Sequence, residues 1–218
     1  MKIKWFGQSC FLLTSSSGTR LLIDPYNRLL GYRMPLIETD ILAITHDHRD
    51  HNQIQAATGY DLLVNKPYVY THNQVTIRGI PTYHDKVNGA KRGNNTVYVI
   101  QMDDLTICHC GDLGHLLSSD QVREIGHVDI LMVPVGGTRT LDGREAAETI
   151  HQLQPAITIP MHYRTKALGL AGCFLFDKVD TFLQASGMNV SEVHELHVTK
   201  EQLPTTAHVV VLHYESIR

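Results

Sequence analysis

The sequence predicts a single α+β domain, with α/β as the alternative, in which two β-sheets pack together and helices lie outside them. The chain has 218 residues, of which 43% are hydrophobic, which is enough for one large core. Two β-rich portions are each followed by units in which a strand precedes a helix. No Ser/Pro-rich linker or low-complexity segment separates these portions, so we expect one domain over residues 1–218.

The first half of the chain is predicted to be mostly strands. Apolar and polar residues alternate over 2–16 and 19–26, which predicts a hairpin around Ser17-Gly18. The run ILAIT at 41–45 is short, apolar and contains β-branched residues, the pattern of a strand that is buried on both faces. The other elements predicted in this half are a short helix and two strands, at 52–58, 61–65 and 75–84.

The second half is predicted to combine strands with three helices. Ser118 with Gln121 forms a capping box, and Asp142 with Glu145 forms the cap of the next helix. A hairpin is predicted from 96–101 and 105–112. The helices are expected at 118–126, 142–154 and about 176–187, and further strands at 128–137, 156–162 and 208–214.

Composition argues against several classes of protein. The formal net charge is −3 and no basic stripe is visible, so no nucleic-acid partner is expected. No apolar run approaches the ~20 residues of a membrane span. The N-terminal residues lack the long apolar segment of a secretory signal, and the four scattered cysteines suit a reducing compartment. We therefore expect a cytoplasmic protein.

Histidines and aspartates gather where the predicted strands end. The stretch HDHRDH at 46–51 directly follows the buried strand 41–45. A sheet holds the end of a strand in place while the following loop stays open to substrate, so these positions suit ligands and catalytic groups. We expect one shared cleft lined by this stretch and by the other residues at strand ends, which are Asp24, His84, Asp112 and His162.

The spacing H-x-H-x-D-H predicts metal chelation. In an extended turn, His46 and His48 point the same way and can chelate one ion. The chain then bends, so that Asp50 and His51 can face a second ion. Imidazoles combined with a carboxylate suit Zn²⁺, Mn²⁺ or Fe²⁺ better than Mg²⁺ or Ca²⁺.

The motif THDHRDH resembles the signature of the metallo-β-lactamase superfamily. Four further stretches resemble the other motifs of that family in their order along the chain: LIDPY, PTYH, CHCGDLG and IPMHY. The resemblance implies a four-layer αβ/βα sandwich with two metal ions at one edge of its sheets. It implies that Asp112 bridges the ions and that Asp24 steadies the ligand loop. The remaining implied ligands are His46, His48 and His84 for the first ion, and Asp50, His51 and His162 for the second.

Within the superfamily, the chain is similar to short Zn-dependent hydrolases such as the L-ascorbate-6-phosphate lactonase group. This likeness implies two divalent ions, with Zn²⁺ expected and Mn²⁺ or Fe²⁺ as alternatives. A hydroxide shared by the ions would cleave an ester, lactone or phosphodiester bond of a small, anionic substrate. The relatives also suggest a homo-oligomer. A di-iron redox enzyme and a phosphodiesterase or nuclease-type member of the superfamily remain the alternatives.

Four residues are candidates for proton transfer or for a structural role. Asp112 or Asp50 could orient the nucleophile and pass a proton. His115 could donate a proton to the leaving group, and a capping or surface role is its alternative. His109 lies an odd number of residues before Asp112 on a strand, so we expect it on the opposite face in a structural role.

Three further residues are candidates for substrate binding. Arg92 and Asn94 belong to a polar, cationic loop after His84 that could bind a phosphate or carboxylate group. A solvated loop is the alternative interpretation. Tyr163 follows His162 and is expected to shape the pocket.

Overall fold

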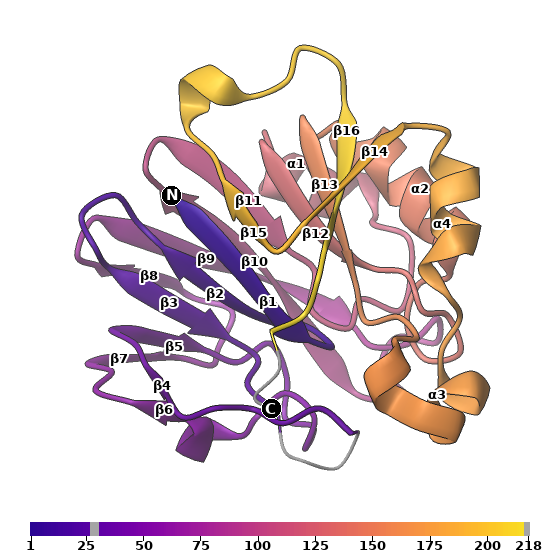
Figure 1. The fold of residues 1–218 in the computed structure, drawn as a ribbon, viewed down its shortest axis with the longest axis horizontal. Coiled ribbons are helices and arrows are strands. Elements are labelled where there is room, and N and C mark those ends of the chain that lie inside the picture. The colour runs from indigo at the N-terminus through magenta and orange to yellow at the C-terminus, as the bar shows by residue number, and fades with distance from the viewer. Residues whose placement is uncertain (27–30, 216–218) are drawn as a thin grey trace.

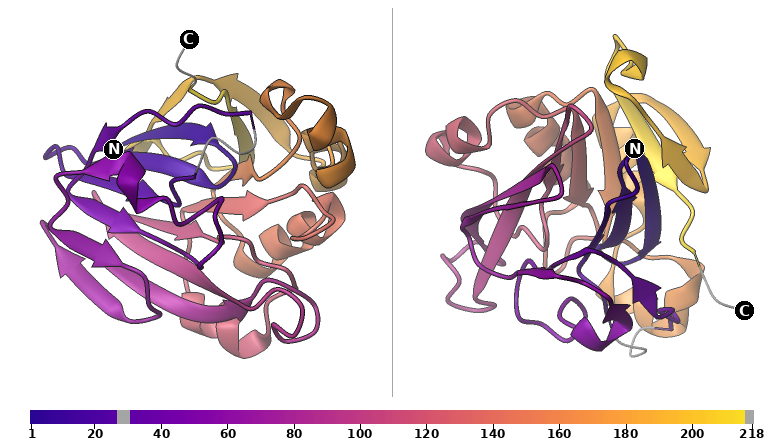
Figure 2. Two further views of the ribbon diagram at one scale, coloured as in Figure 1. Left: turned by 90° about the horizontal axis from the view of Figure 1, so that it is seen from below. Right: turned by 90° about the vertical axis from the view of Figure 1, so that its left-hand side faces the viewer.

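Two β-sheets pack face to face in the computed structural model, which describes residues 1–26 and 31–215. Figures 1 and 2 show the indigo and purple strands of the first sheet against the magenta and orange strands of the second. Helices α1, α2 and α4 lie beside the second sheet, and α3 lies near one end of the sandwich (Figure 1). The predicted α+β sandwich of the metallo-β-lactamase type is confirmed.

The first sheet has six strands in the order β15-β1-β2-β3-β5-β7. Strands β2 and β3 form the predicted hairpin, but the first strand predicted over 2–16 divides into β1 and β2, so that β1, β2 and β3 form an antiparallel meander. Strand β5 then adds in parallel to β3. A separate two-stranded sheet pairs β4 with β6. The strands are β1 (Lys2–Gly7), β2 (Cys10–Thr14), β3 (Arg20–Ile23), β4 (Ile37–Glu38), β5 (Ile41–Ala43), β6 (Ala57–Thr58), β7 (Leu62–Val64) and β15 (Glu195–His197).

The second sheet has eight strands in the order β14-β16-β13-β12-β11-β10-β9-β8. Pairing is antiparallel from β8 to β11 and parallel from β11 through β12 and β13 to β16 and β14. The strands are β8 (Val69–His72), β9 (Val75–Tyr83), β10 (Asn94–Met102), β11 (Leu105–His109), β12 (Ile130–Pro134), β13 (Ile157–Met161), β14 (Asn189–Val193) and β16 (His208–Leu212).

Two of the predicted helices begin as their capping residues indicate. In α1 (Ser119–Ile125) and α2 (Gly143–Leu153), Ser118 and Asp142 are the caps, and both helices have a complete capping box. The third helix, α4 (Val179–Ser186), begins three residues later than its predicted start at 176, and α3 (Gly169–Leu175) was not predicted. No helix among the described residues is long and apolar enough to cross a membrane.

The helix predicted over 52–58 is wrong. That stretch forms one 3₁₀ turn, Ile54–Ala56, and the short strand β6. Gln53 makes no side-chain cap hydrogen bond, and pairing of Ala57 with Ile37 competes with helix formation. Tertiary pairing therefore overrides the weak local helix preference.

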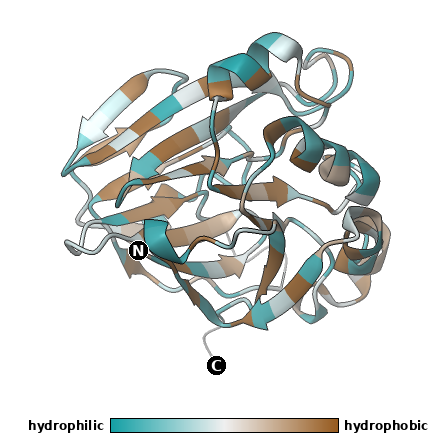
Figure 3. Cartoon of the chain, turned by 90° about the horizontal axis from the view of Figure 1, so that it is seen from above, coloured by the Kyte–Doolittle hydropathy of each residue, from teal (hydrophilic) through white to brown (hydrophobic). Residues whose placement is uncertain are grey.

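Strand β5 is buried on both faces, which confirms the interpretation of residues 41–45. Ile41 and Ala43 belong to the core between the two sheets, whereas Leu42 belongs to a second cluster on the outer face. That outer cluster is covered by loop residues such as Tyr32 and by Leu168 of a 3₁₀ turn. Hydrophobic residues accordingly dominate the strands in Figure 3.

Strand direction brings the chemically important segments to one edge. β11, β12 and β13 run parallel, and β9 has the same direction because two antiparallel pairings separate it from β11. In the first sheet, β3 and β5 are also parallel. The residues that follow β9, β11 and β13 therefore emerge together, as do the residues that follow β3 and β5.

Candidate metal centre

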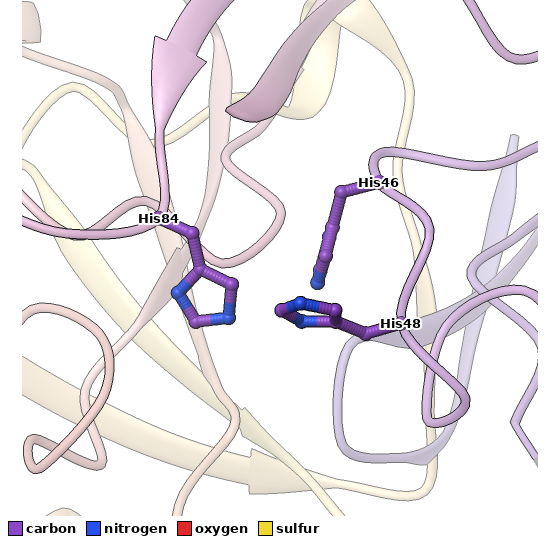
Figure 4. Close-up of side chains that lie close together, drawn as sticks. All are labelled: His46, His48 and His84. Atoms are coloured by element: carbon purple, nitrogen blue, oxygen red, sulfur yellow. The ribbon is translucent and has the colours of Figure 1, made fainter. Parts of the chain in front are cut away.

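The expected ligands form two adjacent groups. His46, His48 and His84 have ligand atoms that all lie within 4.8 Å of one another. Figure 4 shows these three rings converging from the loop after β5 and from the end of β9. A second group with the same spacing consists of Asp50, His51 and His162. The structure thus brings together residues that lie more than 100 positions apart in the chain, in the two sets expected from the sequence.

Asp112 lies between the two groups. Its Oδ2 atom is 3.0 Å from Nε2 of His84, 3.2 Å from Nε2 of His51 and 3.3 Å from Nε2 of His162. Burial opposes ionisation of this carboxyl group, but the neighbouring His162 and His51 outweigh that effect and hold its pKa well below the usual range. An ionised oxygen that faces both groups is suited to bridge two cations.

Asp24 orients His51 from behind. Nδ1 of His51 lies 2.9 Å from Oδ2 of Asp24, and the same carboxylate accepts hydrogen bonds from the amide and hydroxyl of Thr45 at 2.7 and 2.6 Å. Asp24 is fully buried at the end of β3. Because Nδ1–H of His51 is directed at the carboxylate, its Nε2 lone pair points into the ligand cluster.

His46 and His84 are oriented in the same way. The Thr45 hydroxyl donates its only hydrogen bond to Asp24. Its oxygen therefore accepts from Nδ1–H of His46 at 3.0 Å. Nδ1–H of His84 donates to the backbone oxygen of Arg139 at 3.1 Å. In all three imidazoles the hydrogen bond at Nδ1 leaves Nε2 facing the ligand cluster. Although burial opposes it, Asp112 and Asp24 raise the pKa of His51 well above its usual value, so a metal that binds Nε2 of His51 would displace a proton.

The nitrogen and oxygen atoms of this cluster are suited to bind metal ions. Nε2 of His46, Nε2 of His51 and both ring nitrogens of His162 are buried and make no well-aligned hydrogen bond among the described residues, although Nε2 of His51 and of His162 lie 3.2 and 3.3 Å from Oδ2 of Asp112. Leaving such atoms unpaired in the interior is costly, so their convergence indicates a ligand that satisfies them. Burial and the nearby His51 also lower the pKa of His46 well below its usual value, which keeps that imidazole neutral and able to coordinate.

The turn that carries Asp112 is held by residues that the sequence did not reveal as part of the site. The Ser9 hydroxyl donates to Oδ1 of Asp112 at 3.3 Å, and the Asn95 side-chain oxygen accepts from the Asp112 amide at 3.0 Å. His109 supports this turn: it accepts from the Gly111 amide and donates Nε2–H to the Ser9 carbonyl at 2.9 Å. These bonds match the structural role expected for His109.

A cavity of about 280 Å³ opens at the ligand cluster. Among the candidates for substrate binding, Arg92 lines it. Three other residues of the lining were not predicted: Arg49, which lies inside the histidine motif itself, Arg139 and Phe176. The Phe176 ring packs edge-on against His162 at 4.9 Å and forms an apolar wall.

Three of the residues predicted for catalysis or substrate binding, His115, Asn94 and Tyr163, lie outside the lining of this cavity. Nε2 of His115 accepts from the Tyr83 amide at 3.2 Å, and Nδ1 lies 2.8 Å from the Leu116 carbonyl. Asn94 is exposed at the start of β10. Tyr163 is buried, with its ring 5.2 Å from that of Trp5.

Asp85 organises the loop after His84. Its carboxylate accepts hydrogen bonds of 2.8–2.9 Å from the amides of Val87, Gly89, Lys91 and Arg92. Desolvation opposes ionisation, but these four bonds lower the pKa of Asp85 to about 2. The signal in the sequence is an aspartate at the start of a loop rich in Gly and Asn, where Asx-type turns are common.

Comparisons with known proteins agree with this geometry. A family model described as a β-lactamase superfamily domain matches residues 2–162. A UPF0173 metal-dependent hydrolase of Thermococcus onnurineus is 31% identical over 193 residues, which cover 76% of this chain and 85% of the relative. A UPF0173 protein of Pyrococcus abyssi is 32% identical over 198 residues, or 80% of this chain and 89% of that protein.

A solved structure extends the likeness to nearly the whole chain. It is a protein from Thermotoga maritima described as a candidate Zn-dependent hydrolase of the metallo-β-lactamase superfamily. The two share 34% identity and a TM-score of 0.79, over 98% of this chain and 99% of that one. The ligand geometry and these relatives agree: the chain belongs to the metallo-β-lactamase superfamily and is a metal-dependent hydrolase.

Proposed function

We propose that this hydrolase uses two divalent ions. The buried, unpaired imidazole nitrogens around the Asp112 carboxylate carry the proposal, because one oxygen there faces both ligand groups. His46, His48 and His84 hold one ion, Asp50, His51 and His162 hold the other, and Asp112 lies between them. Zn²⁺ is the expected metal for this mixture of imidazoles and carboxylates, with Mn²⁺ and Fe²⁺ as alternatives.

The bond cleaved is an ester, lactone or phosphodiester. A pair of divalent ions, when bound, lowers the pKa of water and polarises a carbonyl or phosphoryl oxygen. Asp112 and Asp50 orient the attacking water. Asp50 is the better placed of the two to take up a proton, because its side chain is 32% exposed at the cavity whereas that of Asp112 is 3% exposed.

The cavity wall indicates how the substrate is held. Arg92 supplies a cationic group for an anionic substrate, and Phe176 supplies an apolar surface beside His162. We assign no step to His115, because its two ring nitrogens face backbone groups of Tyr83 and Leu116. Asn94 and Tyr163 are likewise left without a role at the substrate.

A screen of metal-loaded protein tests the proposal. Matched lactones, carboxylic esters and phosphodiesters are assayed with the wild type, His46→Ala and the control His151→Ala, which removes an exposed histidine of α2. We expect Zn-dependent turnover that His46→Ala abolishes and His151→Ala leaves intact. Equal rates for the wild type and His46→Ala on every compound would refute the proposal. Iron in the purified protein together with oxygen consumption would favour the redox alternative.

A further inference from the structure

A second cavity adjoins the metal cavity. It has a volume of about 420 Å³ and lies between the loop after His84, the loop after β12 and the first turn of α2. Arg92 and Arg139 line both cavities. The two arginines therefore stand at the boundary between the proposed reaction centre and a further compartment.

The acidic side chains of the second cavity are already engaged. Asp85 accepts the four loop amides, and Asp142 caps α2 by accepting from the amides of Arg144 and Glu145. Glu145 accepts from the Asp142 amide and pairs with Lys86. Each of these carboxylates has its partners without using the guanidinium group of Arg92 or Arg139.

Arg92 and Arg139 remain available. Neither guanidinium forms an ion pair with another residue in the described part of the chain, and neither donates a side-chain hydrogen bond there. Two cationic groups that share a wall with a proposed pair of metal ions repel one another unless an anion lies among them. The planar fork of arginine matches the geometry of phosphate and carboxylate oxygens.

Both arginines are tied to the segment that carries a metal ligand. The Arg92 amide donates to Oδ2 of Asp85 at 2.8 Å, and the Arg139 carbonyl accepts from Nδ1–H of His84 at 3.1 Å. Gly114 presses against the same segment, since a Cβ atom there would lie 2.4 Å from the His84 carbonyl carbon. The backbones of the two arginines thus have fixed positions relative to His84.

We propose that Arg92 and Arg139 bind an oxyanionic group of the substrate, a phosphate or a carboxylate, that is not itself hydrolysed. This group occupies the second cavity while the scissile bond lies in the metal cavity. Asp85 is a positioning residue that holds the Arg92 loop. The inference rests on the proposed hydrolase function and narrows its substrates to compounds that carry an anionic group beside the bond that is cleaved.

Anion binding provides the first test. Inorganic phosphate and acetate are titrated calorimetrically into metal-loaded wild type, Arg92→Gln/Arg139→Gln and Asp85→Asn. The control is Arg144→Gln, the same change at an exposed arginine of α2 outside both linings. Anion that binds to the metal ions does so in every variant. Differences in anion affinity between the variants therefore measure the contribution of Arg92 and Arg139.

We expect the double variant to bind the preferred anion at least about tenfold more weakly, and Asp85→Asn to weaken it less. Arg144→Gln should match the wild type. A larger loss for phosphate assigns a phosphate group, and a larger loss for acetate assigns a carboxylate. If the double variant binds both anions as the wild type does, the inference is overturned.

Substrate selectivity provides the second test and separates this inference from the proposed function. Two substrates with the same scissile bond, one neutral and one bearing the anionic group, are compared by kcat/KM. The double variant should reduce the preference for the anionic substrate, which is the ratio of the two kcat/KM values, at least about tenfold. Metal-dependent turnover with an unchanged preference refutes the arginine site alone. Absence of turnover by the wild type refutes the hydrolase proposal, and with it the assignment of the anion as a substrate group.

Discussion

Asp24 shows how one buried carboxylate controls a metal ligand without touching the substrate. It accepts hydrogen bonds from Thr45 and holds Nδ1–H of His51 at 2.9 Å. The Thr45 hydroxyl in turn fixes the ring of His46. One side chain at the end of β3 therefore sets the orientation of two imidazoles in different ligand groups.

We predict that Asp24→Asn weakens metal binding about 10–100-fold, the range typical for residues that orient metal ligands. The carboxylate accepts the Thr45 amide at Oδ1 and the Thr45 hydroxyl and His51 at Oδ2, whereas the amide has one acceptor oxygen and must give up the bonds made at one of these two positions. Zinc affinity measured by competition with a chromophoric chelator checks this. The control Asp61→Asn changes an exposed aspartate outside the cluster and should bind zinc as the wild type does. Unchanged affinity in Asp24→Asn would contradict the role assigned to Asp24.

Gly114 is a second residue that affects the position of a metal ligand without binding metal itself. It packs so closely on the ligand segment that a Cβ atom would lie 2.4 Å from the Asp85 amide nitrogen and 2.4 Å from the His84 carbonyl carbon. We predict that Gly114→Ala displaces His84 and reduces bound zinc from two ions per chain toward one. Metal content after gel filtration, measured by mass spectrometry, tests this. Gly18→Ala is the control: a Cβ atom there meets no atom within 4 Å, so the positive φ of 94° strains only the turn between β2 and β3, and bound zinc should stay as in the wild type.

At the scale of elements, Asp129 joins three segments of the second sheet. Its carboxylate accepts from the Thr106 amide of β11 at 2.8 Å and from Nζ of Lys200 at 2.7 Å. Its backbone carbonyl accepts from Ile157 at the start of β13. Desolvation raises the pKa of Asp129, but the hydrogen bonds from Lys200, Thr106 and His127 outweigh this effect and lower the pKa below its usual value.

This shift gives a pH dependence of definite sign. The folded pKa of Asp129 lies below the unfolded value of about 3.9, so its contribution to stability is present above that pH and is lost as the pH falls through the folded pKa. We predict that Asp129→Asn lowers the free energy of unfolding by about 1–3 kcal/mol at pH 7. The difference from the wild type should shrink below about pH 4.

Urea unfolding of the two proteins at pH 7 and pH 3 measures the effect of Asp129. The control is Asp104→Asn, which changes an exposed aspartate in the turn between β10 and β11. Its free energy of unfolding should equal that of the wild type at both pH values. A stability difference for Asp129→Asn that is as large at pH 3 as at pH 7 would show that the charge of Asp129 is not responsible.

At the scale of the whole molecule, the ligands join the two sheets. His46, His48, Asp50 and His51 follow β5 of the first sheet, whereas His84, Asp112 and His162 follow strands of the second. A ligand that binds these residues only when they are assembled must stabilise the packing of one sheet on the other.

We therefore predict that removal of metal by a chelator lowers the melting temperature. Metal at 100 times its Kd stabilises the folded state by about 2.7 kcal/mol. For a chain of this size that corresponds to a shift of roughly 5–10 °C. Differential scanning calorimetry with and without zinc measures it, and His46→Ala should show a much smaller shift. Melting that is independent of zinc in the wild type would contradict a metal centre shared by both sheets.

Local pattern alone determined much of this protein. The run at 41–45 predicted a strand buried on both faces, and Ser118 and Asp142 predicted the starts of α1 and α2. Through their resemblance to those of a known superfamily, the motifs pointed to seven residues, and the structure places Nε2 of four of them, His46, His51, His84 and His162, 3.0–3.9 Å from Oδ2 of a fifth, Asp112. Such features are readable because periodicity, caps and ligand chemistry are properties of short segments.

Only the tertiary structure decided which other side chains reach the site. Arg139 and Phe176 enter the cavity, and Ser9 reaches Asp112, although no local pattern marks them. Conversely, Tyr163 and His115 follow ligand residues closely but turn away from the cavity, toward Trp5 and the Tyr83 backbone. Strand register and loop conformation set these positions through contacts between segments far apart in the chain. The sequence of one segment does not specify which other segment it will contact.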